Sequence, residues 1–472
     1  MAVYCDVLVA GGSTTGCFFA RKMAEQGYKV IVADALPAHR VGEHLPVFHV
    51  DKPKFDELGI PRPGPGDEDY IGEFAAGSYY PPSGQYKMRG DPSQHIVYAD
   101  YPFLVCRLPQ FIQRLRAWCM DAGVEFLDET EFKDLIYCRH GVRGAHLIGP
   151  DGEITVYARL VADCSGGSAV VRRALRKPTP VEDFEAGPRD RMFVILKFLK
   201  LKYPEREAPR RAEHWAYYKG WIGLAEKPDE AIIGVGASLS YEYAEKCMER
   251  FLSAVEMPEG KIIREERGSL PYRRPPYSLV DNGFVALGDA ACMNKWVGEG
   301  ICSGWVGCQM AAEVAGEAMR NGAYPTLEAL WLLNVKYNTT QQADFAYINA
   351  TAINAVDCSE AEMDYEFEKG MVFNDKAMTR LNWTYSAEMP PEEVAQLIAK
   401  MVAGLATGNI SPRTLKGMLK GVACSTLLQA HYRAFPKTPK GFGAWASKCD
   451  KLWELCGNIA DVTERVEARN NI

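Results

Sequence analysis

The first apolar segment of the chain is short and nearly continuous, CDVLVA at residues 5–10. Such a run is typical of a strand that is covered on both faces, as in a parallel sheet. The loop GGSTTG follows at 11–16, and CFFARKMAEQ after it places apolar side chains at helical spacing. A second apolar run, YKVIVA at 28–33, ends at Asp34. The pattern predicts a strand–helix–strand unit of the kind that binds a dinucleotide.

The middle of the chain alternates short apolar runs with turns, and its last third does not. A helix is predicted over 110–122, mainly strands over 190–240 and another helix over 241–256. The apolar run FVALGDA then precedes a helix that begins near Gly300. From about Leu327 onward the pattern predicts long helices without strand signals.

Composition narrows the class of protein. The chain has 472 residues and 47% hydrophobic residues, enough for two or three domains that enclose a ligand. Its net charge of -7 argues against nucleic acid as the main partner. The 14 cysteines form no CxxC pair, so we infer a reducing compartment and assign no metal ligands.

We predict a cytoplasmic protein, because neither a signal peptide nor a membrane span is visible in the sequence. The segment MAVYCDVLVAGG enters an apolar strand at once, without a basic region followed by a long apolar stretch. No run approaches the roughly 20 apolar residues of a membrane span. A peripheral membrane contact stays open, because an amphipathic surface can supply one without a span.

The loop between the first two strands carries the first chemical motif. In a G-x-G-x-x-G register Gly11 and Gly16 fit, and Ser13 stands in the place of the middle glycine. Glycines allow the backbone to approach a pyrophosphate, and the helix N-terminus offers free N–H groups to its charge. We therefore expect the backbone of Gly11, Ser13, Thr14, Thr15 and Gly16 to bind the phosphates, although a plain turn would show the same letters.

An acid lies where a ribose contact is expected. Asp34 ends the second strand, 23 residues after Gly11. A carboxylate there accepts hydrogen bonds from the ribose hydroxyls of an adenosine. We expect Asp34, with Ala35 beside it, to bind the adenosine ribose; a turn aspartate is the alternative.

A second motif lies far from the first one in the sequence and favours FAD over NAD as the cofactor. Residues 284–319 contain a strand ending in Gly288-Asp289, then Gly298-Glu299-Gly300, then a helix. This string resembles the para-hydroxybenzoate hydroxylase-like flavoproteins. The resemblance implies that Asp289 binds a ribityl hydroxyl of FAD. It also implies that the backbone at Gly298, Gly300 and Ile301 faces the flavin, where a helix dipole would stabilise the reduced, anionic form.

Two more segments resemble the same superfamily. In YADYPFLVCRLPQF, the resemblance implies that Arg107 contacts the flavin or its phosphates, with a surface or core-pairing arginine as the alternative. The segment LVADCSGGSAVVRRAL, at 160–175, resembles the part of these proteins that packs beside the FAD phosphates.

Within this superfamily the chain resembles the geranylgeranyl reductase family over roughly residues 1–320. The similarity includes the stretches AGSYYPPSGQYKMRGDP, GWIGLAEKPDEAIIGVG and GSLPYRRPPYSLVDNGFVALGDAA. The family's enzymes reduce isolated C=C bonds in prenyl chains with a reduced flavin. The chain departs from the family at 41–46, where VGEHLP is closer to a string found in flavin-dependent halogenases.

The resemblance implies an α/β fold: a Rossmann-like FAD-binding domain, a β-rich substrate domain and a helical C-terminal cap. The FAD-binding domain is expected to be discontinuous. The boundaries are 1–75, 104–177 and 270–326 for the FAD-binding domain, 76–103 and 178–269 for the substrate domain, and 327–472 for the helical region.

Three functions share this cofactor. Reduction of a prenyl-like C=C bond ranks first, with a hydride leaving the flavin for one carbon and a proton reaching the other. A monooxygenase or halogenase acting on an aromatic substrate ranks second, and an electron-transfer flavoprotein subunit is the non-catalytic alternative. Ser165-Gly166 stands where hydroxylases that use NADPH directly carry Asp-Gly. We therefore expect an apolar small-molecule substrate and a separate electron donor: a reductase, ferredoxin or reduced nicotinamide.

Two residues are candidates for the catalytic proton step. Glu43 and His44 lie in the loop that should pass near the flavin. Either side chain could donate a proton or contact the flavin. A solvent-exposed loop position is the alternative for both.

Overall fold

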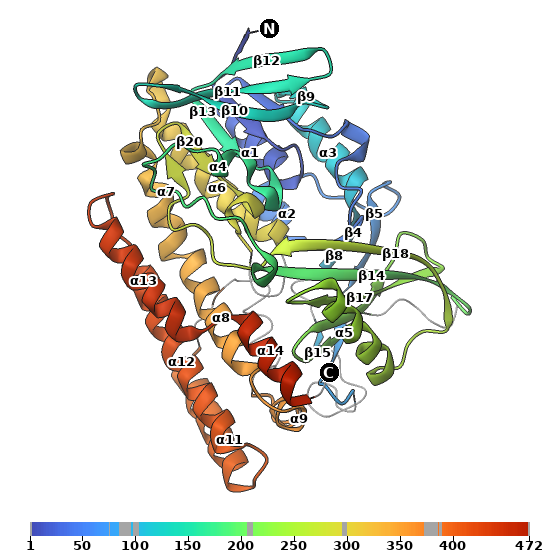
Figure 1. The fold of residues 1–472 in the computed structure, drawn as a ribbon. Helices are drawn as coiled ribbons and strands as arrows, with labels where there is room; N and C mark the ends of the chain where they lie inside the picture. Colours follow the sequence, from blue (N-terminus) through green and yellow to red (C-terminus); the bar gives the residue numbers. More distant parts are fainter. Residues whose placement is uncertain are drawn as a thin grey trace.

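A sheet that is parallel except for its edge strand Val280–Asp281 lies at the centre of the part that carries both motifs. The computed structural model describes residues 2–74, 76–84, 96–97, 103–204, 211–294, 300–371, 386 and 389–470 (Figure 1). The sheet has six strands. In spatial order they are β19 (Val280–Asp281), β20 (Phe284–Ala286), β13 (Leu160–Asp163), β2 (Val7–Ala10), β3 (Val30–Ala33) and β9 (Glu125–Leu127).

The predicted strand–helix–strand unit forms because its strands are apolar throughout. Every residue of β2 and β3 is buried, and the two strands pair in parallel. Helix α1 (Thr14–Ala24) connects them and buries Phe18, Phe19 and Met23. A four-stranded sheet lies beside this unit. Its strands are β1 (Ala2–Tyr4), β12 (Gly152–Tyr157), β11 (Gly141–Gly149) and β10 (Glu131–Cys138).

A second large sheet joins two distant parts of the chain. It has seven strands, and α5 (Tyr241–Ala254) packs against it. Its order is β18 (Gly260–Pro271), β14 (Arg191–Leu201), β17 (Glu230–Ala237), β16 (Lys219–Leu224), β15 (Arg211–Trp215), β6 (Ala76–Tyr80) and β7 (Ile96–Val97). Strands β6 and β7 thus come from the segment that the sequence assigned to the substrate domain with 178–269.

A small sheet and short helices connect these parts. Strand β8 (Phe103–Arg107) lies between β4 (Val47–Asp51) and β5 (Tyr70–Phe74), and it leads directly into α3 (Leu108–Met120). Helix α2 (Lys52–Leu58) follows β4, and α4 (Val170–Arg173) follows β13.

The last part of the chain is helical, as predicted. Among the described residues after 327 the elements are α7 (Leu327–Thr339), α8 (Gln341–Ala355), α9 (Glu360–Glu368), α11 (Pro391–Ala406), α12 (Pro412–Arg433), α13 (Phe442–Cys456) and α14 (Ile459–Asn470). Helix α12 packs along α8, and α11 to α13 form the outer edge of the molecule at the left of Figure 1. In the described part of the chain, no helix is both long and apolar enough to cross a bilayer.

One buried tryptophan connects the two motif-bearing segments. Trp305 lies on α6 (Gly300–Ala318) and is fully buried. Its ring packs against those of Phe18, Phe55 and Phe111, with centroids 5.7–6.3 Å apart. Its Nε1 donates a hydrogen bond of 3.2 Å to the carbonyl of Thr14 in the first turn of α1. The start of α1 is thereby held against α6.

Replacing Trp305 by alanine should destabilise the fold strongly. The variant leaves a cavity among aromatic rings, and such changes cost about 3–5 kcal/mol. The matched control is Leu332→Ala on α7, whose side chain is 51% exposed. We expect it to change the free energy of unfolding by under about 0.5 kcal/mol. Denaturant titration measures both, and equal effects would contradict the role given to Trp305.

Candidate functional site

The GGSTTG loop runs so close to its neighbours that only glycine fits at two positions. Gly11 has φ +105°, and a Cβ atom there would collide with the carbonyl oxygen of Cys164. A Cβ at Gly16 would collide with the carbonyl oxygen of Gly11. The loop is therefore a tight turn that presents backbone rather than side chains at the end of β2.

The first turn of α1 can accept an anion. Its N-cap, Ser13, is extended, with φ −83° and ψ −164°, and makes no capping hydrogen bond. The first turn carries no acidic side chain. Its N–H groups and the positive end of the helix dipole thus suit a phosphate at Ser13, Thr14 and Thr15.

Asp34 lies directly beside this loop. Its Oδ2 accepts a 2.7 Å hydrogen bond from the backbone N–H of Gly12, and its Oδ1 accepts a 2.9 Å bond from that of Leu36. Ala35, the next predicted residue, is exposed. Each carboxylate oxygen accepts more than one donor, so a ribose could still bind at Asp34.

The second loop meets the first one in space. Gly288 has φ +60°, and a Cβ there would lie 2.6 Å from Oγ1 of Thr15. Asp289 follows, and a Cβ at Gly300 would lie 3.1 Å from its Oδ1. Segments more than 270 residues apart thus converge, with the start of α1 against Gly288 and Asp289 against the start of α6. Gly298 lies outside the described residues, and Ile301 is half-buried in the first turn of α6.

The Asp289 carboxyl is suited to a hydroxyl ligand. Among the described residues its side chain has no hydrogen-bond partner, and burial raises its pKa. The residue is half-buried, and a carboxyl that has lost part of its hydration without gaining a partner carries a free-energy cost unless a donor reaches it. The polyhydroxylated ribityl chain of FAD has such donors, so the residues present fit this cofactor.

Arg107 makes structural hydrogen bonds. Its Nη1 donates to the carbonyls of Glu68 and Tyr70 at 2.5 and 2.9 Å, and its Nη2 donates to that of Glu226 at 2.5 Å. These bonds connect Arg107 with the start of β5 and with the turn after β16. The core-pairing alternative therefore describes the bonds observed, and a flavin contact of Arg107 stays a prediction.

Glu43 and His44 are exposed side chains. Glu43 accepts a 2.9 Å hydrogen bond from Nε of Arg40. No hydrogen bond or ion pair between described residues connects either side chain with the GGSTTG loop or with Asp289. Their catalytic role stays a prediction.

Sequence reasoning missed a buried cation beside Asp34. Arg116 on α3 is 5% exposed, its Nη2 donates to Asp128 at 2.8 Å, and its guanidinium lies over the ring of Phe126. Its Nη1 is buried without a partner among the described residues. A Cβ at Gly12 would lie 3.5 Å from this nitrogen. The available signal was an arginine on the apolar face of the predicted helix 110–122.

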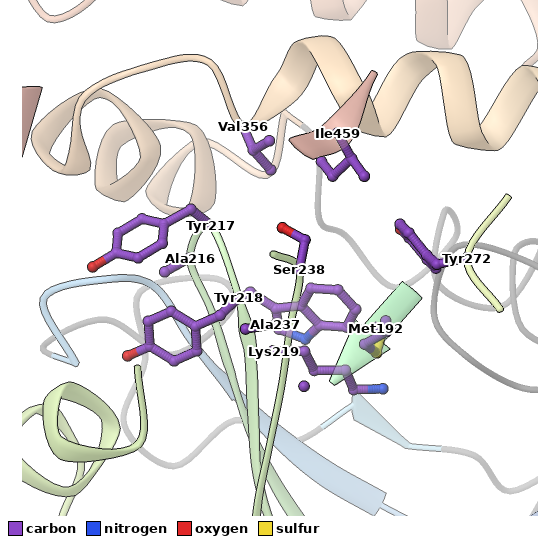
Figure 2. Close-up of a pocket in the computed structure, with 12 residues that line it drawn as sticks. Met192, Ala216, Tyr217, Tyr218, Lys219, Ala237, Ser238, Tyr272, Val356 and Ile459 are labelled. Atoms are coloured by element: carbon purple, nitrogen blue, oxygen red, sulfur yellow. The ribbon is translucent and has the colours of Figure 1, made fainter. Parts of the chain in front are cut away.

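An apolar pocket lies between the seven-stranded sheet and the C-terminal helices (Figure 2). It contains about 450 Å³ of space that is not filled by protein atoms, part of it open to solvent. Val356 and Ile459, from the ends of α8 and α14, face the sheet across it. The sheet and its loops contribute Met192, Trp215, Ala216, Tyr217, Tyr218, Lys219, Gly236, Ala237, Ser238 and Tyr272.

A short path connects the pocket wall with the second loop. Tyr272 of the pocket follows Pro271, whose carbonyl accepts a 2.7 Å hydrogen bond from Nδ2 of Asn294. Asn294 lies between Asp289 and the start of α6. The pocket wall is therefore anchored to the loop that carries Asp289.

Comparison with known proteins gives both sequence and structural relatives. The chain is 24% identical over 469 residues to the digeranylgeranylglycerophospholipid reductase of Sulfolobus acidocaldarius, covering 95% of this chain and 97% of that protein. The crystal structure of a geranylgeranyl bacteriochlorophyll reductase-like protein from Thermoplasma acidophilum has a TM-score of 0.64 and 16% identity, covering 89% of this chain and all of that one. A triple mutant of the flavin-dependent brominase Bmp2 has a TM-score of 0.59 and 14% identity, covering 84% and 98%. No protein-family model matches the chain.

The wall behind the pocket contains a histidine that should titrate at low pH. His214 on β15 is fully buried, stacks on Phe251 and lies 3.2 Å from the carbonyl of Pro82 through Nε2. Burial lowers its pKa from 6.5 to about 4. The unfolded chain binds this proton at a higher pH than the folded protein does. The stability due to neutral His214 is therefore complete above pH 6.5 and lost as the pH falls through about 4.

The variant His214→Phe keeps an aromatic ring on Phe251 but cannot titrate. We expect the melting temperature of the unaltered protein to fall more steeply than that of the variant between pH 6.5 and 4. Thermal denaturation across this range measures the difference. Parallel curves for the two proteins would contradict the lowered pKa.

Proposed function

The chain belongs to the geranylgeranyl reductase family of FAD-dependent oxidoreductases, and from that premise we propose that it reduces a C=C bond in an apolar, prenyl-like substrate. The pocket between the seven-stranded sheet and the helices carries this proposal. It is lined mainly by apolar and aromatic side chains, and the hydroxyl of Ser238 is already bonded to Thr463 at 2.8 Å. An apolar chain suits such a wall better than a highly polar substrate does.

The converging loops would hold the FAD. The pyrophosphate would lie on the N–H groups of Ser13, Thr14 and Thr15, and Asp34 would accept hydrogen bonds from the ribose hydroxyls. Arg116 would donate from its free Nη1 to the adenosine half. Asp289 would accept a hydrogen bond from a ribityl hydroxyl, beside the start of α6. When bound, the flavin would supply the hydride that reduction of a C=C bond needs.

The protein's own contribution is to position the substrate and exclude water. Trp215, Met192 and Ile459 line the pocket from three elements, so an alkene held there would exchange part of its contact with water for contact with apolar side chains. The buried hydroxyl of Tyr272 stays protonated, because burial raises its pKa. We propose a separate electron donor, since Ser165-Gly166 lacks the acid found in hydroxylases that take NADPH directly.

Variants at the two ends of the site should show which half of the cofactor each end binds. Asp289→Asn should weaken binding of both FAD and FMN about tenfold or more, because both carry the ribityl chain. Arg116→Met should weaken binding of FAD about tenfold and leave FMN unchanged, because FMN lacks the adenosine. Titration of the apoprotein, followed by flavin fluorescence, measures both affinities.

The control for these variants is Arg114→Met on the same helix as Arg116. Arg114 donates to both carboxylate oxygens of Asp69, at 2.6 and 2.8 Å, so its loss should lower the melting temperature. We expect it to leave both flavin affinities unchanged. Loss of FMN binding in Arg116→Met would show that the variant disturbs the fold rather than an adenosine contact.

The reaction itself is tested by reoxidation of the reduced protein. The FAD-loaded protein is reduced anaerobically and mixed with a polyprenyl substrate, and the flavin absorbance is followed. We expect reoxidation without oxygen and a product heavier by two hydrogens in mass spectrometry. Reoxidation only by oxygen together with an aromatic substrate would assign the protein to the monooxygenases or halogenases instead. Reoxidation by a protein partner alone would favour an electron-transfer subunit.

A further inference from the structure

We propose that the outer surface of α11 and α12 binds the surface of an anionic lipid bilayer. This inference goes beyond the proposed function, because it concerns where the protein works rather than which bond it reduces. We call this surface the cap face and define it by Ile398, Val402, Leu405, Leu419 and Leu427, together with the lysines named below.

Helix α11 exposes an apolar side although its other side is already packed. Met401 and Gly404 face the molecule, where Met401 contacts Ile410 and Met418 in a small core. Ile398, Val402 and Leu405 remain 48%, 56% and 37% exposed. They recur at intervals of four and three residues, so they form one continuous stripe along the helix.

Helix α12 adds both apolar and basic side chains. Leu419 and Leu427 are 50% and 53% exposed and lie eight residues apart, which places them on one side of the helix. Lys416 and Lys420 are exposed beside Leu419. Neither lysine has an acidic partner among the described residues. Exposed leucines next to unpaired lysines are the pattern of a helix that lies in a membrane interface.

The charge of this region is opposite to that of the whole chain. Residues 391–456 contain nine Lys or Arg and four Asp or Glu, a net charge of +5, whereas the chain carries −7. Such a basic region attracts an anionic surface, and the attraction weakens as salt screens it. A bilayer with anionic lipids offers negative charge and apolar depth together, so it complements both features of the cap face.

The cap face is also suitably placed for a substrate that comes from a membrane. The helices α11 and α12 that carry it lie at the outer edge of the molecule (Figure 1), and α12 packs along α8. Val356, directly after the last residue of α8, lines the apolar pocket. One layer of helix therefore separates the cap face from the helices that close the pocket.

Vesicle sedimentation with the full-length, FAD-loaded protein tests the proposal. The probes are vesicles of phosphatidylcholine alone and of phosphatidylcholine mixed with phosphatidylglycerol. We expect binding to the anionic vesicles that weakens with added salt and is at least tenfold weaker on neutral ones. The double variant Ile398→Ser/Val402→Ser should bind at least tenfold more weakly, and Lys416→Gln/Lys420→Gln should lose the preference for anionic vesicles.

The controls change exposed residues elsewhere. Leu332→Ser, on α7, and Lys202→Gln, directly after β14, remove an exposed apolar or basic side chain and should bind as the unaltered protein does. Equal binding of all variants, or no binding at all, would overturn the proposal. A dimer that dissociates in Ile398→Ser/Val402→Ser would also overturn it, because the cap face would then be an interface between two copies.

The test is independent of the proposed reaction. Turnover of a detergent-dispersed substrate should be unchanged in both cap-face double variants, since neither touches the pocket or the loops. Vesicle binding without any C=C reduction would leave the cap face assigned and the proposed function wrong. Reduction without vesicle binding would support the proposed function and overturn the assignment of the cap face.

Discussion

The contact between the starts of α1 and α6 is the constraint on which the site depends. Gly288 lies so close to Thr15 that no side chain fits between them, and the indole of Trp305 is bonded to the carbonyl of Thr14. Together these contacts fix two helix N-termini relative to each other. A ligand that spans both ends requires such rigidity, because a small displacement of either end would break half of its contacts.

The local parts of this arrangement could be predicted from sequence. The runs CDVLVA and YKVIVA specify buried parallel strands, and glycines mark the tight turn between them, since backbone geometry is set by neighbouring residues. Asp34 was placed correctly at the end of β3 for the same reason. The approach of Asp289 to this unit was predicted from a resemblance, because no short-range pattern encodes a contact across more than 270 residues.

The remaining parts depend on tertiary packing. Arg107 has a motif position, yet its hydrogen bonds reach Glu68, Tyr70 and Glu226, three carbonyls that no spacing rule connects with it. Arg116 was overlooked because its role depends on its tertiary neighbours. Only the fold places β9 and the glycine loop beside this arginine. The pocket was expected only in general terms, since its walls come from the sheet and from the helices after residue 327.

The helical region supplies one wall of the apolar pocket. A seven-stranded sheet alone would expose Met192 and Trp215 to water, and α8 and α14 supply the opposite wall through Val356 and Ile459. These helices must in turn be covered, and α12 does so along α8. The successive layers place each apolar surface against another until the outermost helices, α11 and α12, where Ile398 stays exposed. That exposure marks a side of the helical region where packing against the protein's own core ends.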